Sequence, residues 1–157
     1  MSTPSGNSSP AALAAVVTLC LFPWIAVPNG AGDLTFVMSW GLVNTNSWHV
    51  LSLAGYIEAA RGFETLPWSL QVWPIGLGLS LGSVVSAAGG VVADREDPRL
   101  TVGLLVLSAA GSAIVWQGLV GRGTSGAIPV GLVATGVVIW WFYWPALRRF
   151  GGRHPAE

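Results

Sequence analysis

The chain has 157 residues, of which 52% are hydrophobic and only 9% are charged. A soluble domain carries roughly 25% charged residues, so this composition predicts a membrane protein with no separate soluble domain. Seven basic and seven acidic residues give zero formal net charge, which argues against nucleic-acid binding, and a single cysteine excludes an internal disulfide.

The N-terminal part predicts a tail followed by a first membrane span. Residues 1–10 are polar and rich in Ser and Pro, which is typical of a short disordered tail. Residues 11–27 then run without a charge as far as Pro28 and Gly30, and we interpret them as the first transmembrane helix. A cleaved signal peptide is the alternative, but no Lys or Arg precedes the apolar run.

Residues 29–66 predict an outer cap that lies on the membrane surface. Apolar and polar side chains alternate over residues 34–40, which predicts a strand or one arm of a short β-hairpin. Asn46 or Ser47 is suited to cap an amphipathic helix over residues 48–61. A fifth membrane helix over residues 34–60 is the alternative, but it would place five polar residues near the hydrocarbon centre: Asn44, Thr45, Asn46, Ser47 and His49.

Three further spans are predicted after the cap, over residues 74–93, 100–120 and 128–144. The most charged stretch of the chain, residues 94–99, separates the first two of them and must lie in water. Residues 150–157 form a second tail.

We therefore expect one membrane domain over residues 11–149. Its expected fold is all-α, with four transmembrane helices, an outer amphipathic helix and a short β-hairpin between the first two spans. In this arrangement five arginines lie on one side of the membrane: Arg95, Arg99, Arg148, Arg149 and Arg153. Arg61 and Arg122 lie on the other side, and this asymmetry predicts a cell-membrane protein with both termini in the cytoplasm.

Several short sequences resemble one family. They are a Trp-x-x-x-Pro sequence at the exit of the first span, residues 36–46, Trp48-His49 and Trp73-Pro74. The chain resembles the uncharacterised multi-pass membrane proteins of haloarchaea whose genes tend to lie near that of the archaeosortase. The resemblance covers residues 11–149, and the absence of Lys fits a salt-adapted source. It implies a membrane fold and a link to surface-protein processing, but no activity.

Residues for catalysis, a cofactor or a metal are not predicted anywhere in the chain. None of the four predicted spans contains Asp, Glu, Lys, Arg or His, whereas transporters and proton relays depend on such groups at membrane depth. Cys20 lies within the first predicted span, away from His49 and His154, so no base is expected to activate it. Two histidines and one cysteine also lack the spacing of metal ligands.

Small residues recur every four positions along the second predicted span, at Gly78, Gly82, Ser86 and Gly90. In lipid, such residues let helix backbones approach closely. We expect this face to pack against other helices of the same chain, with a homodimer contact as the alternative.

The outer cap holds the candidate partner-binding residues, which are Trp40, Trp48, His49 and Tyr56. Aromatic side chains are typical anchors of protein contacts and of membrane interfaces. We therefore expect a non-catalytic interaction or accessory protein at the cell surface, in contact with the bilayer and a membrane protein partner and not with nucleic acid. A membrane enzyme that acts on a lipid or lipid-linked substrate through His49, Tyr56 or Glu58 is the main alternative, and transport or signalling is a further one. The oligomeric state is left open.

Overall fold

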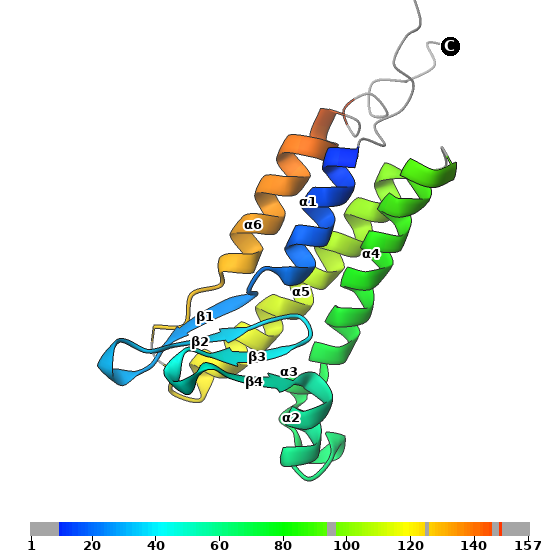
Figure 1. Cartoon of the computed structure of the whole chain (residues 1–157). Helices are drawn as coiled ribbons and strands as arrows, with labels where there is room; N and C mark the ends of the chain where they lie inside the picture. Colours follow the sequence, from blue (N-terminus) through cyan, green and yellow to red (C-terminus); the bar gives the residue numbers. More distant parts are fainter. Residues whose placement is uncertain (1–9, 94–96, 125, 146–147, 149–157) are drawn as a thin grey trace, which may run out of the picture.

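A computed structural model describes residues 10–93, 97–124, 126–145 and 148. Four helices lie side by side, and a four-stranded sheet with two short helices occupies one end of this bundle (Figure 1). The tails predicted over residues 1–10 and 150–157 lie outside the described residues, apart from Pro10.

The bundle helices differ in length. They are α1 (Pro10–Leu21), α4 (Trp73–Ala93), α5 (Pro98–Gly121) and α6 (Val130–Val138), which continues as a π-helical turn, η4 (Ile139–Tyr143). The start of α5 is well defined because the Asp97 side chain accepts a hydrogen bond from the Arg99 backbone at 2.9 Å and Pro98 occupies the first turn.

The sheet is an antiparallel meander in the order β1-β2-β3-β4. Its strands are β1 (Ile25–Pro28), β2 (Leu34–Val37), β3 (Gly41–Asn44) and β4 (His49–Ser52). Ile25 pairs with Val37 and Val37 pairs with Leu42, so these apolar residues lie on one face of the sheet. The backbones of Ala26 and Ile128 exchange two hydrogen bonds, which cover the outer edge of β1.

Two short helices connect the sheet to the bundle, α2 (Leu53–Ala59) and α3 (Trp68–Gln71). The Ser52 hydroxyl caps α2 by accepting a hydrogen bond from Gly55 N at 3.1 Å. Three 3₁₀ turns complete the connections: η1 (Gly30–Gly32), η2 (Asn46–Trp48) and η3 (Phe63–Thr65).

Hydroxyl and small side chains fill the contact between α4 and α5. The buried positions of α4 are spaced alternately by three and four residues: Trp73, Gly76, Ser80, Ser83, Ala87 and Gly90. In α5 they include Thr101, Leu105, Ser108, Ser112 and Val115. Ser80 and Ser108 share a hydrogen bond of 2.6 Å, and Ser86 and Thr101 one of 2.8 Å. The large apolar side chains of both helices, such as Val85 and Leu107, point outward instead.

The predicted all-α fold with four transmembrane helices is wrong. The chain is a mixed α/β structure, and among its described residues two helical stretches are long and apolar enough to cross a membrane, Trp68–Val92 and Pro98–Gly121. The first predicted span, residues 11–27, is helical only as far as Leu21, because Pro23 interrupts the helix and the chain then pairs with β2 as a strand.

The last predicted span, residues 128–144, is also too short. Ile128 takes part in the sheet, and the apolar helix covers only Val130–Tyr143. At a rise of 1.5 Å per residue, its 14 residues span roughly 21 Å, which is less than the ~30 Å of a hydrocarbon core.

The predicted cap has more β-structure than expected. The alternating segment 34–40 does begin a hairpin, formed by β2 and β3, but it belongs to a larger sheet. The helix predicted over 48–61 begins only at Leu53, because residues 49–52 pair with β3. The alternative of a fifth membrane helix over 34–60 does not form, since this segment holds three strands followed by the short helix α2.

A glycine pair in α6 tests the packing of the bundle against the sheet. A Cβ atom on Gly131 would lie 2.7 Å from Trp24 Cα and 3.1 Å from the Pro23 carbonyl oxygen, whereas one on Gly136 would meet open space. We expect Gly131→Ala to destabilise the purified protein by about 1–3 kcal/mol, because rigid backbone must move. The matched variant Gly136→Ala should lose no stability. Thermal unfolding in detergent measures both, and equal midpoints would contradict this packing.

Candidate functional site

Trp73, the first residue of α4, connects the bundle to the sheet. Its side chain is 1% exposed, and its indole Nε1 donates to the backbone carbonyls of Met38 at 2.9 Å and Ser39 at 3.0 Å. The Tyr56 ring of α2 packs on it with ring centroids 5.7 Å apart. Trp73 therefore holds the β2–β3 turn and α2 in fixed positions above the helices.

Backbone hydrogen bonds connect the same region to α1 and α6. The Ser39 hydroxyl donates to the carbonyl of Cys20, near the end of α1, at 2.9 Å. Trp24 N donates to Val37 O at 2.8 Å, and Gly131 N donates to Trp24 O at 2.9 Å. The sheet is thus attached to three of the bundle helices.

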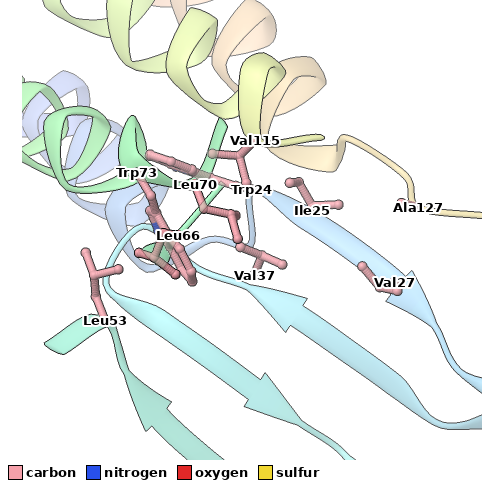
Figure 2. Close-up of a cluster of buried hydrophobic side chains, with 10 residues drawn as sticks. All are labelled: Trp24, Ile25, Val27, Val37, Leu53, Leu66, Leu70, Trp73, Val115 and Ala127. Carbon is pink, nitrogen blue, oxygen red and sulfur yellow. The ribbon is translucent and has the colours of Figure 1, made fainter. Parts of the chain in front are cut away.

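An apolar cluster fills much of the space between the sheet and the ends of the helices. Figure 2 shows Val27 and Val37 on the strands facing Leu70 and Val115 on the helical side. Trp73 closes one side of this cluster. All five side chains are buried, so the junction between the sheet and the helices is closely packed.

A cavity of about 260 Å³ lies within this junction. Strands β1 to β3, helices α2 to α5 and two loops contribute its lining residues. These are Val27, Asn29, Thr35, Val37, Leu42, Tyr56, Leu70, Trp73, Val115, Leu119 and Thr124. Asn29 is the one exposed member, which places the mouth of the cavity at the β1–β2 turn. The walls are mostly aliphatic and aromatic, as in sites that bind small apolar ligands.

Amides and hydroxyls meet at the mouth of the cavity. The Thr35 hydroxyl oxygen accepts hydrogen bonds from the side-chain amides of Asn29 at 2.7 Å and Asn44 at 3.1 Å. The side-chain Oδ1 of Asn44 in turn accepts a hydrogen bond from Asn46 N at 2.7 Å. These bonds hold the β1–β2 turn beside the β3–β4 turn.

Trp48 lies at the tip of the β3–β4 turn and is 77% exposed. Its φ angle is +47°, a left-handed conformation that is uncommon for a large side chain and is often found at functional sites. The next residue, His49, is also exposed. Together they form a protruding aromatic tip.

The structure separates the four predicted partner-binding residues into two sets. Trp48 and His49 are adjacent and exposed, whereas Trp40 and Tyr56 are half-buried. The Trp40 Nε1 atom is buried and has no hydrogen-bond acceptor among the residues that the structure describes. Tyr56 lines the cavity. The cavity itself was not predicted, because its lining residues are scattered between positions 27 and 124.

The predicted packing stripe lies partly on the contact face of α4. Ser86 bonds Thr101, Gly90 is buried, and a Cβ atom on Gly82 would meet Leu104 at 3.5 Å. Gly78 is exposed, with open space where a Cβ atom would lie. The contact face of α4 follows the alternating three- and four-residue spacing described above, which repeats every seven residues. A prediction based on a strict four-residue spacing therefore identifies only part of this face.

Groups able to do proton or metal chemistry are dispersed in the described part of the chain. Within residues 10–93, 97–124, 126–145 and 148, no three His, Cys, Asp or Glu residues lie close enough to hold a metal ion. The Cys20 thiol is directed at the Ser80 carbonyl oxygen, 3.7 Å away. The polar groups of the cavity are instead hydroxyls and an amide, which bind neutral molecules by hydrogen bonds.

One family matches the sequence. The family described as "Domain of unknown function (DUF8050)" matches residues 1–152, which is nearly the whole chain. No curated protein and no solved structure matches the chain.

Two tryptophans test the connection between sheet and bundle. Trp73→Phe leaves the carbonyls of Met38 and Ser39 without their donor, whereas Trp40→Phe removes a donor that bonds no described residue. We expect Trp73→Phe to unfold at a lower temperature, with a loss greater by about 1–3 kcal/mol than that of Trp40→Phe. Thermal unfolding in detergent measures the difference. Equal losses would show that the Trp73 hydrogen bonds do not support the junction.

Proposed function

Because the chain belongs to the DUF8050 family, described only as a domain of unknown function, we propose a function from its structure. In this proposal it is an integral membrane protein, embedded through α4 and α5, whose sheet end lies outside the cell. There it binds a partner protein through the aromatic tip formed by Trp48 and His49.

The distribution of side chains on the helices supports membrane embedding. Only 28% and 33% of the most apolar windows of the two long helical stretches are buried, whereas a core helix of a soluble protein is mostly buried. Val85 is 71% exposed and Val92 is 86% exposed. Each 100 Å² of such surface would cost roughly 2.5 kcal/mol in water. Lipid removes this cost, and it also favours hydroxyls that bond one another inside the bundle.

The arginines support the orientation. Arg99 and Arg148 lie at the end of the bundle opposite the sheet, and the neighbouring loop and C-terminal sequences hold three more. Arg148 lies over the Trp144 ring at 5.1 Å, next to Trp140 and Trp141, an arrangement typical of a membrane interface. The side with more arginine is usually cytoplasmic.

The exposure and backbone conformation of Trp48 carry the proposal of partner binding. A tryptophan that is 77% exposed leaves a large apolar surface in water unless another molecule covers it. Its neighbours in the turn are polar, Asn46 and His49, which favours a protein contact over lipid chains. Tryptophans surrounded by polar residues are common anchors of protein interfaces. The resemblance to haloarchaeal proteins encoded near the archaeosortase suggests a partner in surface-protein processing.

Thiol labelling tests the orientation. In a Cys20→Ser background, we expect Thr65→Cys to react with an impermeant thiol reagent added to intact cells, because residue 65 is exposed at the sheet end. Asp97→Cys lies at the other end and should react only after permeabilisation. Cys20→Ser alone is the background control. Labelling of position 97 in intact cells would contradict the orientation.

Photo-cross-linking in native membranes tests the partner contact. With benzoylphenylalanine in place of His49, we expect one protein adduct of defined mass, reduced at least tenfold when Trp48→Ala is added. The same cross-linker in place of Trp68, which is also exposed but starts α3, should not give this adduct. Adducts with lipid alone at position 49, or a protein adduct unaffected by Trp48→Ala, would contradict the proposal.

A further inference from the structure

We propose that the cavity between the sheet and the helices binds a single aliphatic chain that carries a neutral hydrogen-bonding group, such as a medium-chain or isoprenoid alcohol. This inference goes beyond the partner contact proposed for Trp48 and does not depend on it.

The inner part of the cavity fits the chain. Val37 of the sheet lies opposite Leu70 and Val115 of the helices (Figure 2). Leu42, the strand partner of Val37, lines the same cavity, and the Trp73 ring forms a further wall. The volume of about 260 Å³ exceeds the roughly 150 Å³ of an apolar cavity that admits benzene. At the same volume per carbon atom, it has room for a chain of about ten carbon atoms.

The mouth of the cavity fits the polar group. Thr35 Oγ1 already accepts two hydrogen bonds, from Asn29 and Asn44, so its own hydrogen is left to donate. The Thr35 hydrogen has no acceptor among the residues that the structure describes. The Thr124 hydroxyl lines the same cavity. A ligand hydroxyl or ester oxygen near Asn29 would accept from these groups while its chain points inward.

The lining also selects against charge. Of the cavity-lining residues within the described part of the chain, none is Asp, Glu, Lys, Arg or His. A carboxylate or ammonium group held beside Thr35 at the mouth would lose part of its hydration without gaining an opposite charge, which is unfavourable. A neutral alcohol, by contrast, exchanges its water contacts for those of Thr35 and Asn29. The site therefore distinguishes decanol from decanoate and decylamine.

Photolabelling of the full chain in phosphatidylcholine vesicles tests this inference. The probe is decanol with a diazirine near the end of its chain, and the labelled residues are mapped by mass spectrometry. We expect labels on the lining residues of β3, α3 and α5, reduced at least fivefold by excess unlabelled decanol. Decanoate and decylamine at the same concentration should not reduce them. Labels confined to outward residues such as Val85 and Val133, or equal competition by decylamine, would overturn the proposal.

Two variants with matched controls examine the two parts of the site. Thr35→Val removes the hydroxyl while keeping nearly the same side-chain volume, and Leu42→Phe narrows the chain-binding part. Each should lower cavity labelling at least fivefold. Thr18→Val, whose hydroxyl bonds only within α1, and Val133→Phe, on the outer surface of α6, should leave it unchanged. Circular dichroism checks folding, and unchanged labelling in folded Thr35→Val and Leu42→Phe would overturn the proposal.

A second probe identifies the source of the ligand. A diacylglycerol with the diazirine in one acyl chain, mixed into the same vesicles, presents an ester-linked chain from within the bilayer. Labelling of the cavity by this probe supports a membrane lipid as the ligand, and labelling by decanol alone supports a free alcohol. Absence of cavity labelling with both probes would overturn the proposal.

Discussion

The indole N–H of Trp73 donates to the carbonyls of Met38 and Ser39, and these bonds fix the height of the β2–β3 turn above α4. The sheet has four strands of four residues each, so it buries little apolar surface by itself and depends on packing against the helices. Once Trp73 holds the turn in place, the apolar face of the sheet lies over the helix ends and Tyr56 packs beside it. The cavity is the space that remains between these fixed surfaces.

The bundle reverses the usual distribution of polar and apolar side chains. Ser80, Ser108 and Thr101 are buried and hydrogen-bonded, while large aliphatic residues point outward. Each interhelical hydroxyl bond adds only about 0.6 kcal/mol in a membrane protein, so small side chains and close backbones provide most of the packing energy. Gly111 illustrates this closeness, because a Cβ atom added to it would lie 3.6 Å from Gly76 Cα.

The two long helical stretches could be predicted from the sequence because each is a continuous apolar run between charged or proline-containing segments. The first and last predicted spans failed for related reasons. A helix followed by a strand looks like one apolar run at residues 11–27, and at the last span Ile128, which bridges to β1, continues the apolar run of the helix. Trp48 and Tyr56 were singled out by residue type, but local periodicity cannot show that Trp48 protrudes while Tyr56 lines a cavity. Their positions depend on the pairing of β3 with β4 and on the contact between the rings of Tyr56 and Trp73.

In the proposed membrane-embedded state, the unequal lengths of the bundle helices have a consequence for the surrounding lipid. At 1.5 Å per residue, the 24 residues of α5 extend roughly 36 Å, whereas the 12 residues of α1 extend roughly 18 Å. Since α1 packs beside the similarly short α6, one flank of the molecule offers a much narrower hydrophobic band than the other. A bilayer around it must thin on the α1–α6 flank, or the molecule must tilt. Such a shape favours membranes of low thickness and draws together other proteins that thin the bilayer in the same way.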